Sequence, residues 1–273
     1  RLPADTGMAF VIIMHLERSR KSLLADILTR ETKMDVVILE KPQHPKPNKV
    51  YIIPPNKLIE FSSGTFHVTS RPTNTHSKPI DIFMRSLAED ESHYSLGIIL
   101  SGTGSDGTIG LEFIKSHGGI TFAQTQRSAA YPEMPASAID YGVVDFTLSP
   151  AGIAAELGKI SRNRYLQNAV EKMPREVIPD NNRQMSVIFN LLLTHCGVDF
   201  KEYKPATLKR RILRRMVMHK LQNTGEYAGF LKKNPPEIDK LAEDILINVT
   251  SFFRDKKMYA ALKKSVLPAL LKG

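Results

Sequence analysis

Cysteine is nearly absent from this 273-residue chain, in which Cys196 is the single thiol. One thiol cannot close an internal disulfide, and such a composition suits a reducing compartment, so we expect a cytoplasmic protein. No apolar run approaches the roughly 18–20 residues of a membrane span, which predicts no direct membrane insertion. The first residues, Arg1 to Asp5, lack an initiator Met and a signal-peptide pattern, and we interpret them as an internal start within a longer protein.

Charge is distributed unevenly along the chain. The formal net charge is +10, and residues 184–273 contain 17 Lys/Arg against 8 Asp/Glu, whereas residues 1–183 contain 21 against 20. One part is basic and the other is nearly neutral, which predicts two domains, the second of which meets an acidic partner. The alternative is that a basic, solvated helical surface simply keeps the second domain soluble.

The first part alternates strand and helix patterns. Short apolar runs rich in β-branched residues predict buried parallel strands at 8–13, 49–53, 96–100 and 120–123. Helical periodicity is found at 21–28, 79–88, 108–116 and 135–141. Residues 58–61 and 65–69 predict a hairpin. This alternation predicts an α/β fold, a doubly wound parallel sheet with helices on both faces.

Beyond residue 161 the pattern changes. Residues 162–183 are polar and proline-containing, which predicts a linker. Every later segment has helical periodicity, with predicted helices at 185–195, 205–221, 226–233, 237–247 and 256–272. We therefore predict a first domain at 1–161 and a small all-α domain at 184–255, with 256–273 as the first helix of a further region.

Two polar residues follow predicted strands of the first domain. His15 comes two residues after the strand 8–13, and Asp106 lies in the glycine-rich turn 101–107. Ligands bind at the carboxyl ends of parallel strands, so these two side chains are candidates for the base and the orienting carboxylate of a Ser-His-Asp triad. The alternative is that His15 is a structural or surface residue.

The same turn also matches the spacing of a dinucleotide-binding motif. Gly102, Gly104 and Gly107 spell G-x-G-x-x-G between a predicted strand and a predicted helix. We reject this interpretation because Asp106 would place a negative charge beside the pyrophosphate. The acidic residue expected about twenty positions later is also missing, since residues 122–127 read FAQTQR.

The predicted helix at 205–221 carries a dense group of cations on one side of an apolar stripe. They are Lys209, Arg210, Arg211, Arg214 and Arg215. Because consecutive cations repel, a solvated face is the default interpretation, whereas the predominance of arginine favours bidentate contacts with carboxylate or phosphate. Acidic protein and nucleic acid both fit such contacts, but no zinc-finger or RNP motif is present, so nucleic acid is the weaker candidate.

Five segments of the first part resemble, in family order, the catalytic domain of the chemotaxis protein-glutamate methylesterase, CheB. They read VIIMHL at 11–16, VYIIPP at 50–55, KPIDIF at 78–83, GIILSGTGSDG at 97–107 and MPASA at 134–138. The resemblance implies that His15 is the triad base and Asp106 its orienter. The family hydrolyses glutamate methyl esters on chemoreceptors without a cofactor.

Two positions depart from that family pattern. The residue before the catalytic histidine is usually Gln, and here it is Met14. The family's nucleophilic serine lies in a glycine-rich loop after the first strand, which we expect upstream of Arg1; Ser101 and Ser105 do not match its position. Because a triad without its nucleophile retains little covalent catalysis, we expect the chain alone to be inactive as an esterase.

The second part resembles the N-terminal helical domain of the chemotaxis receptor methyltransferase, CheR. The matching segments are VDFKEYKP at 198–205, the basic helix, NPPEID at 234–239 and INVTSFFR at 247–254. The resemblance implies that Asn248, Thr250 and Arg254 contact S-adenosylmethionine. Read from the residues alone, Asn248 and Thr250 are equally helix-capping groups.

Further implications concern partners and the whole protein. The resemblance implies that the five cations of the basic helix dock onto the acidic cytoplasmic region of chemoreceptors, and that a S-adenosylmethionine-binding domain follows residue 273. Together the two resemblances predict a fragment of a CheB/CheR fusion that removes and adds methyl groups on receptor glutamates. The alternative is a non-catalytic scaffold that uses both folds to bind a receptor or another signalling partner.

Overall fold

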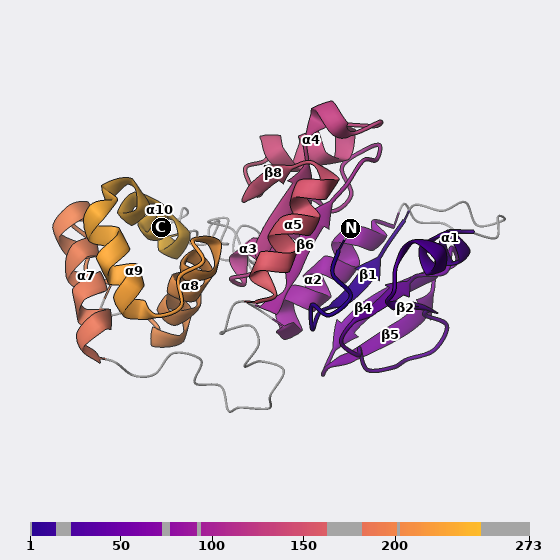
Figure 1. Cartoon of the computed structure of the whole chain (residues 1–273), viewed down its shortest axis with the longest axis horizontal. Coiled ribbons are helices and arrows are strands. Elements are labelled where there is room, and N and C mark those ends of the chain that lie inside the picture. Colours follow the sequence, from indigo (N-terminus) through magenta and orange to yellow (C-terminus); the bar gives the residue numbers. More distant parts are fainter. Residues whose placement is uncertain are drawn as a thin grey trace, which may run out of the picture.

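A computed structural model of the chain describes residues 2–14, 23–72, 77–91, 94–162, 182–200 and 203–246. In these ranges an α/β unit comes first and a group of helices follows it, as Figure 1 shows. Among the described residues, none of the helices is both long and apolar enough to cross a membrane.

Parallel strands form two three-stranded sheets in the first unit. The first sheet has the order β1 (Ala9–Ile12), β3 (Lys49–Ile52), β2 (Asp35–Ile38). The second has the order β6 (Leu96–Ile99), β7 (Ile120–Gln124), β8 (Phe146–Leu148). All five residues of β7 are buried, as expected for the central strand of a parallel sheet covered on both faces.

Helices and one hairpin surround these sheets. The hairpin pairs β4 (Lys57–Ser62) with β5 (Thr65–Ser70) in antiparallel register. The helices of this unit are α1 (Leu24–Glu31), α2 (Pro79–Glu91), α3 (Thr108–Ser116), α4 (Glu133–Asp140) and α5 (Pro150–Ile160), with a short 3-10 turn, η2, at Gln126–Ser128.

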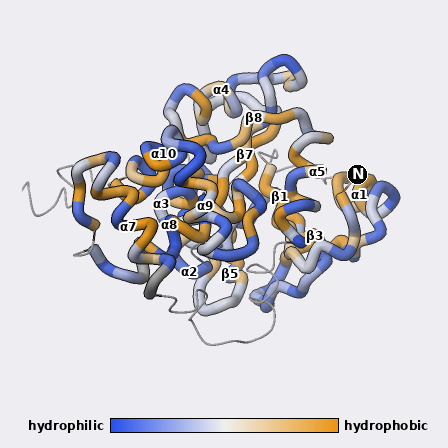
Figure 2. Tube along the Cα trace, turned by 60° about the vertical axis from the view of Figure 1, so that its left-hand side comes forward, coloured by the Kyte–Doolittle hydropathy of each residue, from blue (hydrophilic) through white to orange (hydrophobic). Residues whose placement is uncertain are grey.

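The two sheets share apolar clusters. Phe10 of β1 packs in the same cluster as Ile98 of β6 and Phe122 of β7. Figure 2 shows the strands β1 and β7 as largely hydrophobic segments. A second cluster joins Ile80 and Met84 of α2 to the residues beneath α3. The sheets and helices of the first unit are therefore held by several apolar clusters.

The second unit consists of helices packed on one another. They are α7 (Asn182–Cys196), α8 (Pro205–Met218), α9 (Thr224–Lys233) and α10 (Pro235–Leu246). Their shared core includes Ile188, Phe200, Ile212, Tyr227 and Leu241, all of which are fully or almost fully buried. Prolines stand in the first turn of both α8 and α10, where a missing N–H costs no helical hydrogen bond.

Helix α8 belongs to two cores at once. Ile212 and Met216 point into the helical unit. Leu213 and Val217 instead join the cluster that contains Leu157 of α5 in the α/β unit. Because residues one position apart on a helix point about 100° apart, a helix that is apolar at both sets of positions can bridge two bodies.

The structure confirms the predicted α/β class, with parallel strands and intervening helices followed by a helical region. It differs from the single predicted sheet, because the described strands pair as two three-stranded sheets and a hairpin. The sequence pattern missed β2, β8 and α5; β8 has only three residues, and α5 begins directly after it. The predicted helix at 256–272 lies outside the described residues.

Candidate functional site

The glycine-rich turn 101–107 lies at the carboxyl edge of the β6-β7-β8 sheet. It leaves β6 and leads into α3. The amide of Ser101 donates to Gln124 Oε1 at the end of β7, 2.9 Å away. The Gly104 amide donates to Glu133 Oε2 of α4 at 2.9 Å. The turn is thus hydrogen-bonded both to the neighbouring strand and to a helix.

Asp106 is buried in this turn, with 7% of its surface exposed. Its Oδ2 accepts a hydrogen bond from the Ile80 amide at 3.1 Å, and its Oδ1 accepts one from the Asp81 amide at 2.9 Å. Both donors belong to the first turn of α2, where amides lack helical acceptors. A carboxylate has about four acceptor positions, so one that accepts from two amides can also accept from an imidazole N–H.

His15 lies outside the described residues, so its proximity to Asp106 stays a prediction. The described chain reaches Met14, which follows the end of β1 and is about half exposed. Ser101, which the sequence did not match to a nucleophile, exchanges hydrogen bonds with the backbone of Tyr131. Its hydroxyl is therefore used to connect two loops at the same edge.

Arginines of α8 are bound at the opposite, amino edge of that sheet. Arg211 donates from Nη1 and Nη2 to the carbonyl oxygens of Lys115 and Ser116, at 2.7 and 2.5 Å. These carbonyls belong to the last turn of α3, where the helix dipole is negative and orphan acceptors favour a cation. Burial together with the nearby Arg214 cation lowers the pKa of Arg211 to about 10.

Arg214 is the centre of this contact and its side chain is completely buried. Its Nε donates to the carbonyl of Gly119 at 3.0 Å, just before β7. Its two terminal nitrogens donate to Asp145 of the α/β unit and to Asp244 of α10. One guanidinium therefore joins both units with all of its nitrogens used, which is the arrangement that a buried charge requires.

Asp145 is the matching anion of the α/β unit. Its Oδ2 accepts hydrogen bonds from the amide and the hydroxyl of Thr121, both at 2.9 Å. Burial alone would raise the pKa of Asp145, but the cations of Arg214 and Lys115 outweigh it and hold that pKa below its ordinary value. The carboxylate is thus ionised and fixed at the start of β7, ready to receive Arg214.

Arg215 has a different partner. Its guanidinium binds the carboxylate of Glu237 within the helical unit. Glu237 also lies 2.8 Å from His219 Nε2 and accepts a hydrogen bond from Tyr227 Oη at 3.1 Å. Burial alone would raise the pKa of Glu237, but its hydrogen bonds with His219 and Arg215 lower that pKa to about 2. Arg215 therefore stabilises the packing of α8 on α10.

The expectation of a solvated cationic face is wrong for Arg211, Arg214 and Arg215. All three are buried, with 2–6% of their surface exposed, while Lys209 and Arg210 are partly exposed. Bidentate carboxylate contacts, the other interpretation, are what the structure shows for Arg215 and Glu237. The sequence could not indicate this burial because the carboxylates and carbonyls involved come from 22 to 96 positions away.

The remaining predicted site residues, Asn248, Thr250 and Arg254, lie outside the described residues. Their contact with a cofactor stays a prediction. Among the described residues, no group of three or more His, Cys, Asp or Glu side chains is arranged to hold a metal ion.

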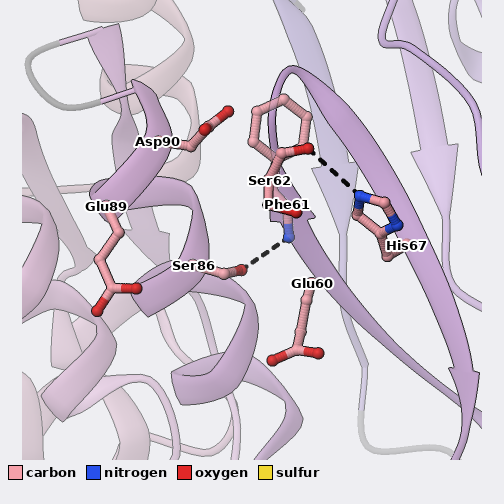
Figure 3. A pocket seen from close by; sticks show the side chains of 7 residues that line it. All are labelled: Glu60, Phe61, Ser62, His67, Ser86, Glu89 and Asp90. Atoms are coloured by element: carbon pink, nitrogen blue, oxygen red, sulfur yellow. Dashed lines mark hydrogen bonds between the residues drawn. The ribbon is translucent and has the colours of Figure 1, made fainter.

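An open pocket of roughly 330 Å³ lies between the β4-β5 hairpin and α2 (Figure 3). Its lining is acidic and includes Glu60, Glu89 and Asp90. Asp90 accepts the amides of Ser63 and Gly64 at 2.9 Å, so it fastens the hairpin turn to α2. His67 Nε2 faces the carbonyl of Ser62 at 3.3 Å. These contacts are structural, and Asp106 is not among the described residues that line the pocket.

Comparison with known families agrees with both parts of the chain. The CheB methylesterase family model matches residues 1–157, and the model of the CheR methyltransferase all-alpha domain matches residues 183–246. The chain belongs to the CheB methylesterase family and continues into a CheR-type helical domain. The predicted CheB/CheR-type fusion is thereby confirmed.

Individual relatives match either most of the chain or its first part. A 104.1 kDa protein of Rhodobacter capsulatus, described as uncharacterized, is 32% identical over 91% of this chain and 28% of its own length. A protein-glutamate methylesterase/protein-glutamine glutaminase of Carboxydothermus hydrogenoformans is 32% identical over 58% of this chain and 48% of its own length. The chain thus spans about half or less of the relatives it matches.

A solved structure gives the same fold for the first part. The CheB methylesterase catalytic domain of Thermotoga maritima superposes with a TM-score of 0.54 and 26% sequence identity. The match covers 58% of this chain and 87% of that domain. Asp106 thus lies in a domain of the methylesterase fold, in the segment that carried the sequence resemblance.

Proposed function

We propose that this chain is part of a cytoplasmic protein that removes and adds methyl groups on glutamates of chemoreceptors. The observation that carries the first activity is the position of Asp106, buried at the carboxyl edge of a parallel sheet in a chain of the methylesterase family. Relatives named protein-glutamate methylesterase/protein-glutamine glutaminase support the ester as the substrate class.

The proposed chemistry is acyl transfer to a serine. A serine N-terminal to residue 1 attacks the ester carbonyl while His15 accepts its proton, and the tetrahedral oxyanion collapses with loss of methanol. Water then hydrolyses the acyl-enzyme. Asp106 would hold the His15 tautomer and stabilise the imidazolium, and the two α2 amides that fix Asp106 support this role. Without that serine, the 273 residues alone would not hydrolyse the ester.

The second activity is assigned to the CheR-type part. Asn248, Thr250 and Arg254 would contribute to an S-adenosylmethionine site completed by sequence after residue 273, with Arg254 pairing with the cofactor carboxylate. S-adenosylmethionine would supply the methyl group. This assignment is supported by the family match over residues 183–246 and by the sequence of the adjoining segment.

We assign receptor docking to α8, through Lys209, Arg210, Arg211, Arg214 and Arg215, and the acidic cytoplasmic region of chemoreceptors is the proposed partner. Arg211 and Arg214 are occupied by the α/β unit. An acidic partner that used these two side chains would therefore have to displace Asp145 and the α3 carbonyls. The partly exposed Lys209 and Arg210 would make the first contact.

The decisive experiment measures methanol release from a methylated receptor fragment. It compares the 273-residue chain with a chain extended upstream by about thirty residues, the length of one βαβ unit. We expect activity only from the extended chain and its loss in His15→Ala. An extended chain that folds but stays inert on several methylated receptors would favour the non-catalytic scaffold instead.

A further inference from the structure

The N-termini of α2 and α3 both lie beside the turn that carries Asp106. Asp106, just before α3, caps α2, and Asp81 of α2 caps α3. Asp106 accepts the amides of Ile80 and Asp81 at the start of α2. In return, Asp81 Oδ1 accepts the amides of Gly107 and Gly110 at the start of α3, at 2.9 and 2.7 Å. Four amides that helical geometry leaves without acceptors are satisfied by two side chains 25 positions apart.

This reciprocal pair needs very close packing of the two helices. Gly110 lies so near α2 that an added Cβ would come within 2.7 Å of Met84 Cβ and 3.2 Å of the Asp81 Cα. Gly107 has φ +95°, and an added Cβ there would come within 2.3 Å of Ile99. Only glycine allows both the left-handed backbone and the approach, so the local sequence is adapted to bring Asp81 onto the α3 amides.

Asp81 acts on Asp106 in two ways. Its own N–H is one of the donors to the Asp106 carboxylate, and its side chain holds Gly107, the residue directly after Asp106. A shift of Asp81 would therefore move both the donor and the backbone of the turn. By contrast, the other side of the turn is held through Gly104 and Ser101, which lie two and five residues before Asp106.

The carboxyl groups of Asp81 and Asp106 affect each other electrostatically. Burial raises the pKa of Asp81, and the charge of Asp106 adds to the rise, while the Gly110 amide and Lys78 oppose it. Lys78 Nζ lies 3.6 Å from Asp81 Oδ2. Two carboxyl groups are kept close together because helix N-termini supply compensating positive potential to both.

We propose that Asp81 is a positioning residue for ester hydrolysis, which sets the orientation of Asp106 through the reciprocal caps of α2 and α3. The inference rests on the proposed function, in which Asp106 orients His15. It gives Asp81 of the KPIDIF segment an indirect role in the reaction, exerted through Asp106.

The test uses the upstream-extended protein and measures kcat, KM and the pH profile of kcat/KM. In Asp81→Ala both α3 amides lose their acceptor, and we expect kcat to fall about 10²-fold, as for a displacement of about 1 Å, with little change in KM. The acidic limb of the profile should move to lower pH, because a poorly placed Asp106 stabilises the protonated base less. Asp81→Asn retains an oxygen acceptor and should stay within a few-fold of wild type.

Ser149→Ala is the matched control. Ser149 caps α5 by accepting the Gly152 amide at 3.2 Å, far from this turn in the chain, so its loss removes a helix cap in the same unit. It should lower stability by a similar amount but leave kcat and the pH profile unchanged. If Asp81→Ala does not fold, Asp81→Glu replaces it, because the carboxylate is kept but moved by one methylene from the two amides.

The outcomes separate this inference from the function on which it rests. If Asp106→Asn is inactive while both Asp81→Ala and Asp81→Glu keep wild-type kcat and pH profile, the positioning role is refuted and the proposed hydrolysis stands. An equal loss of kcat in Ser149→Ala also refutes it. Full activity of Asp106→Asn would overturn the proposed function itself.

Discussion

The two edges of the β6-β7-β8 sheet use carboxylates in different ways. At the carboxyl edge, Asp106 is fixed by amides of α2, a helix of its own unit. At the amino edge, Asp145 is fixed partly by Thr121 of its own unit and partly by Arg214 from the helical unit. The first edge is thus organised within one domain, whereas the second depends on the docking of two domains.

That difference has a direct functional consequence. The helical unit docks where the strands begin, so it leaves the carboxyl edge with Asp106 uncovered by α8. The same docking occupies Arg211 and Arg214, which the proposed function assigns to an acidic partner. Contact between the domains is therefore compatible with the proposed hydrolysis at the carboxyl edge, but it would compete with the proposed receptor docking by α8.

The largest expected effect comes from removing the central cation. Arg214→Ala leaves Asp145 and Asp244 buried without their shared partner, and we expect the free energy of unfolding to fall by about 3–5 kcal/mol. Chemical denaturation of the chain measures this. The control Lys232→Ala removes an exposed cation of α9 and should change stability by less than about 0.5 kcal/mol. Equal effects of the two variants would contradict the domain contact.

A smaller effect is expected from the apolar part of the same contact. Leu213 is 3% exposed in the cluster shared with α5, so Leu213→Ala should cost about 2–4 kcal/mol and separate the unfolding of the two units. Differential scanning calorimetry would then resolve two transitions. Leu193→Ala, at a position of α7 that is 37% exposed, serves as the control and should leave a single transition.

Acid should weaken the helical unit through Glu237. The folded-state pKa of Glu237 is depressed from 4.5 to about 2, so its stabilisation is fully present above pH 4.5 and is lost as pH falls toward 2. The pKa of Asp145 is also lowered, so its protonation in acid should further destabilise the contact between the two units. Thermal melts between pH 6 and pH 2 follow this decline. Glu237→Gln should flatten the profile, and an unchanged slope in that variant would count against Glu237.

The smallest effect concerns a cap that belongs to neither edge. Asn223 Oδ1 accepts a hydrogen bond from the Glu226 amide at 2.8 Å, and Glu226 Oε2 accepts one from the Gln222 amide. Asn223→Ala should lower the free energy of unfolding by about 1 kcal/mol. Amide hydrogen exchange should show faster opening confined to α9. Faster exchange at β7 would mean that the two units are coupled more tightly than the interface predicts.

Much of the carboxyl edge was predictable from the sequence. The apolar run of β6 and the glycine-rich turn after it predicted that Asp106 lies between β6 and the next helix. The structure has it there, because strands and tight turns are encoded by neighbouring residues. The reciprocal cap was not predictable, since Asp81 and Asp106 are 25 positions apart and meet only after α2 and α3 pack. The position of His15 relative to Asp106 stays a prediction.

At the amino edge, by contrast, the sequence predicted little of the structure. The sequence indicated a basic helix with an apolar stripe, but Leu213 and Val217 proved to face a second core. A row of arginines has the same local pattern whether it is solvated or buried. Whether these arginines are buried depends on their partners Asp145, Gly119 and the end of α3, about 70 to 95 positions away in the chain.

The sequence by itself determined the order of strands and helices apart from β2, β8 and α5, the change from an α/β to an all-α part, and the place of Asp106 after β6. These features follow from hydrophobic period and turn chemistry within a few residues. Only the tertiary structure decided which charges are buried, which carboxylates cap which helices and where the two units meet. Those outcomes depend on desolvation and on partners distant in the chain, which no local pattern records.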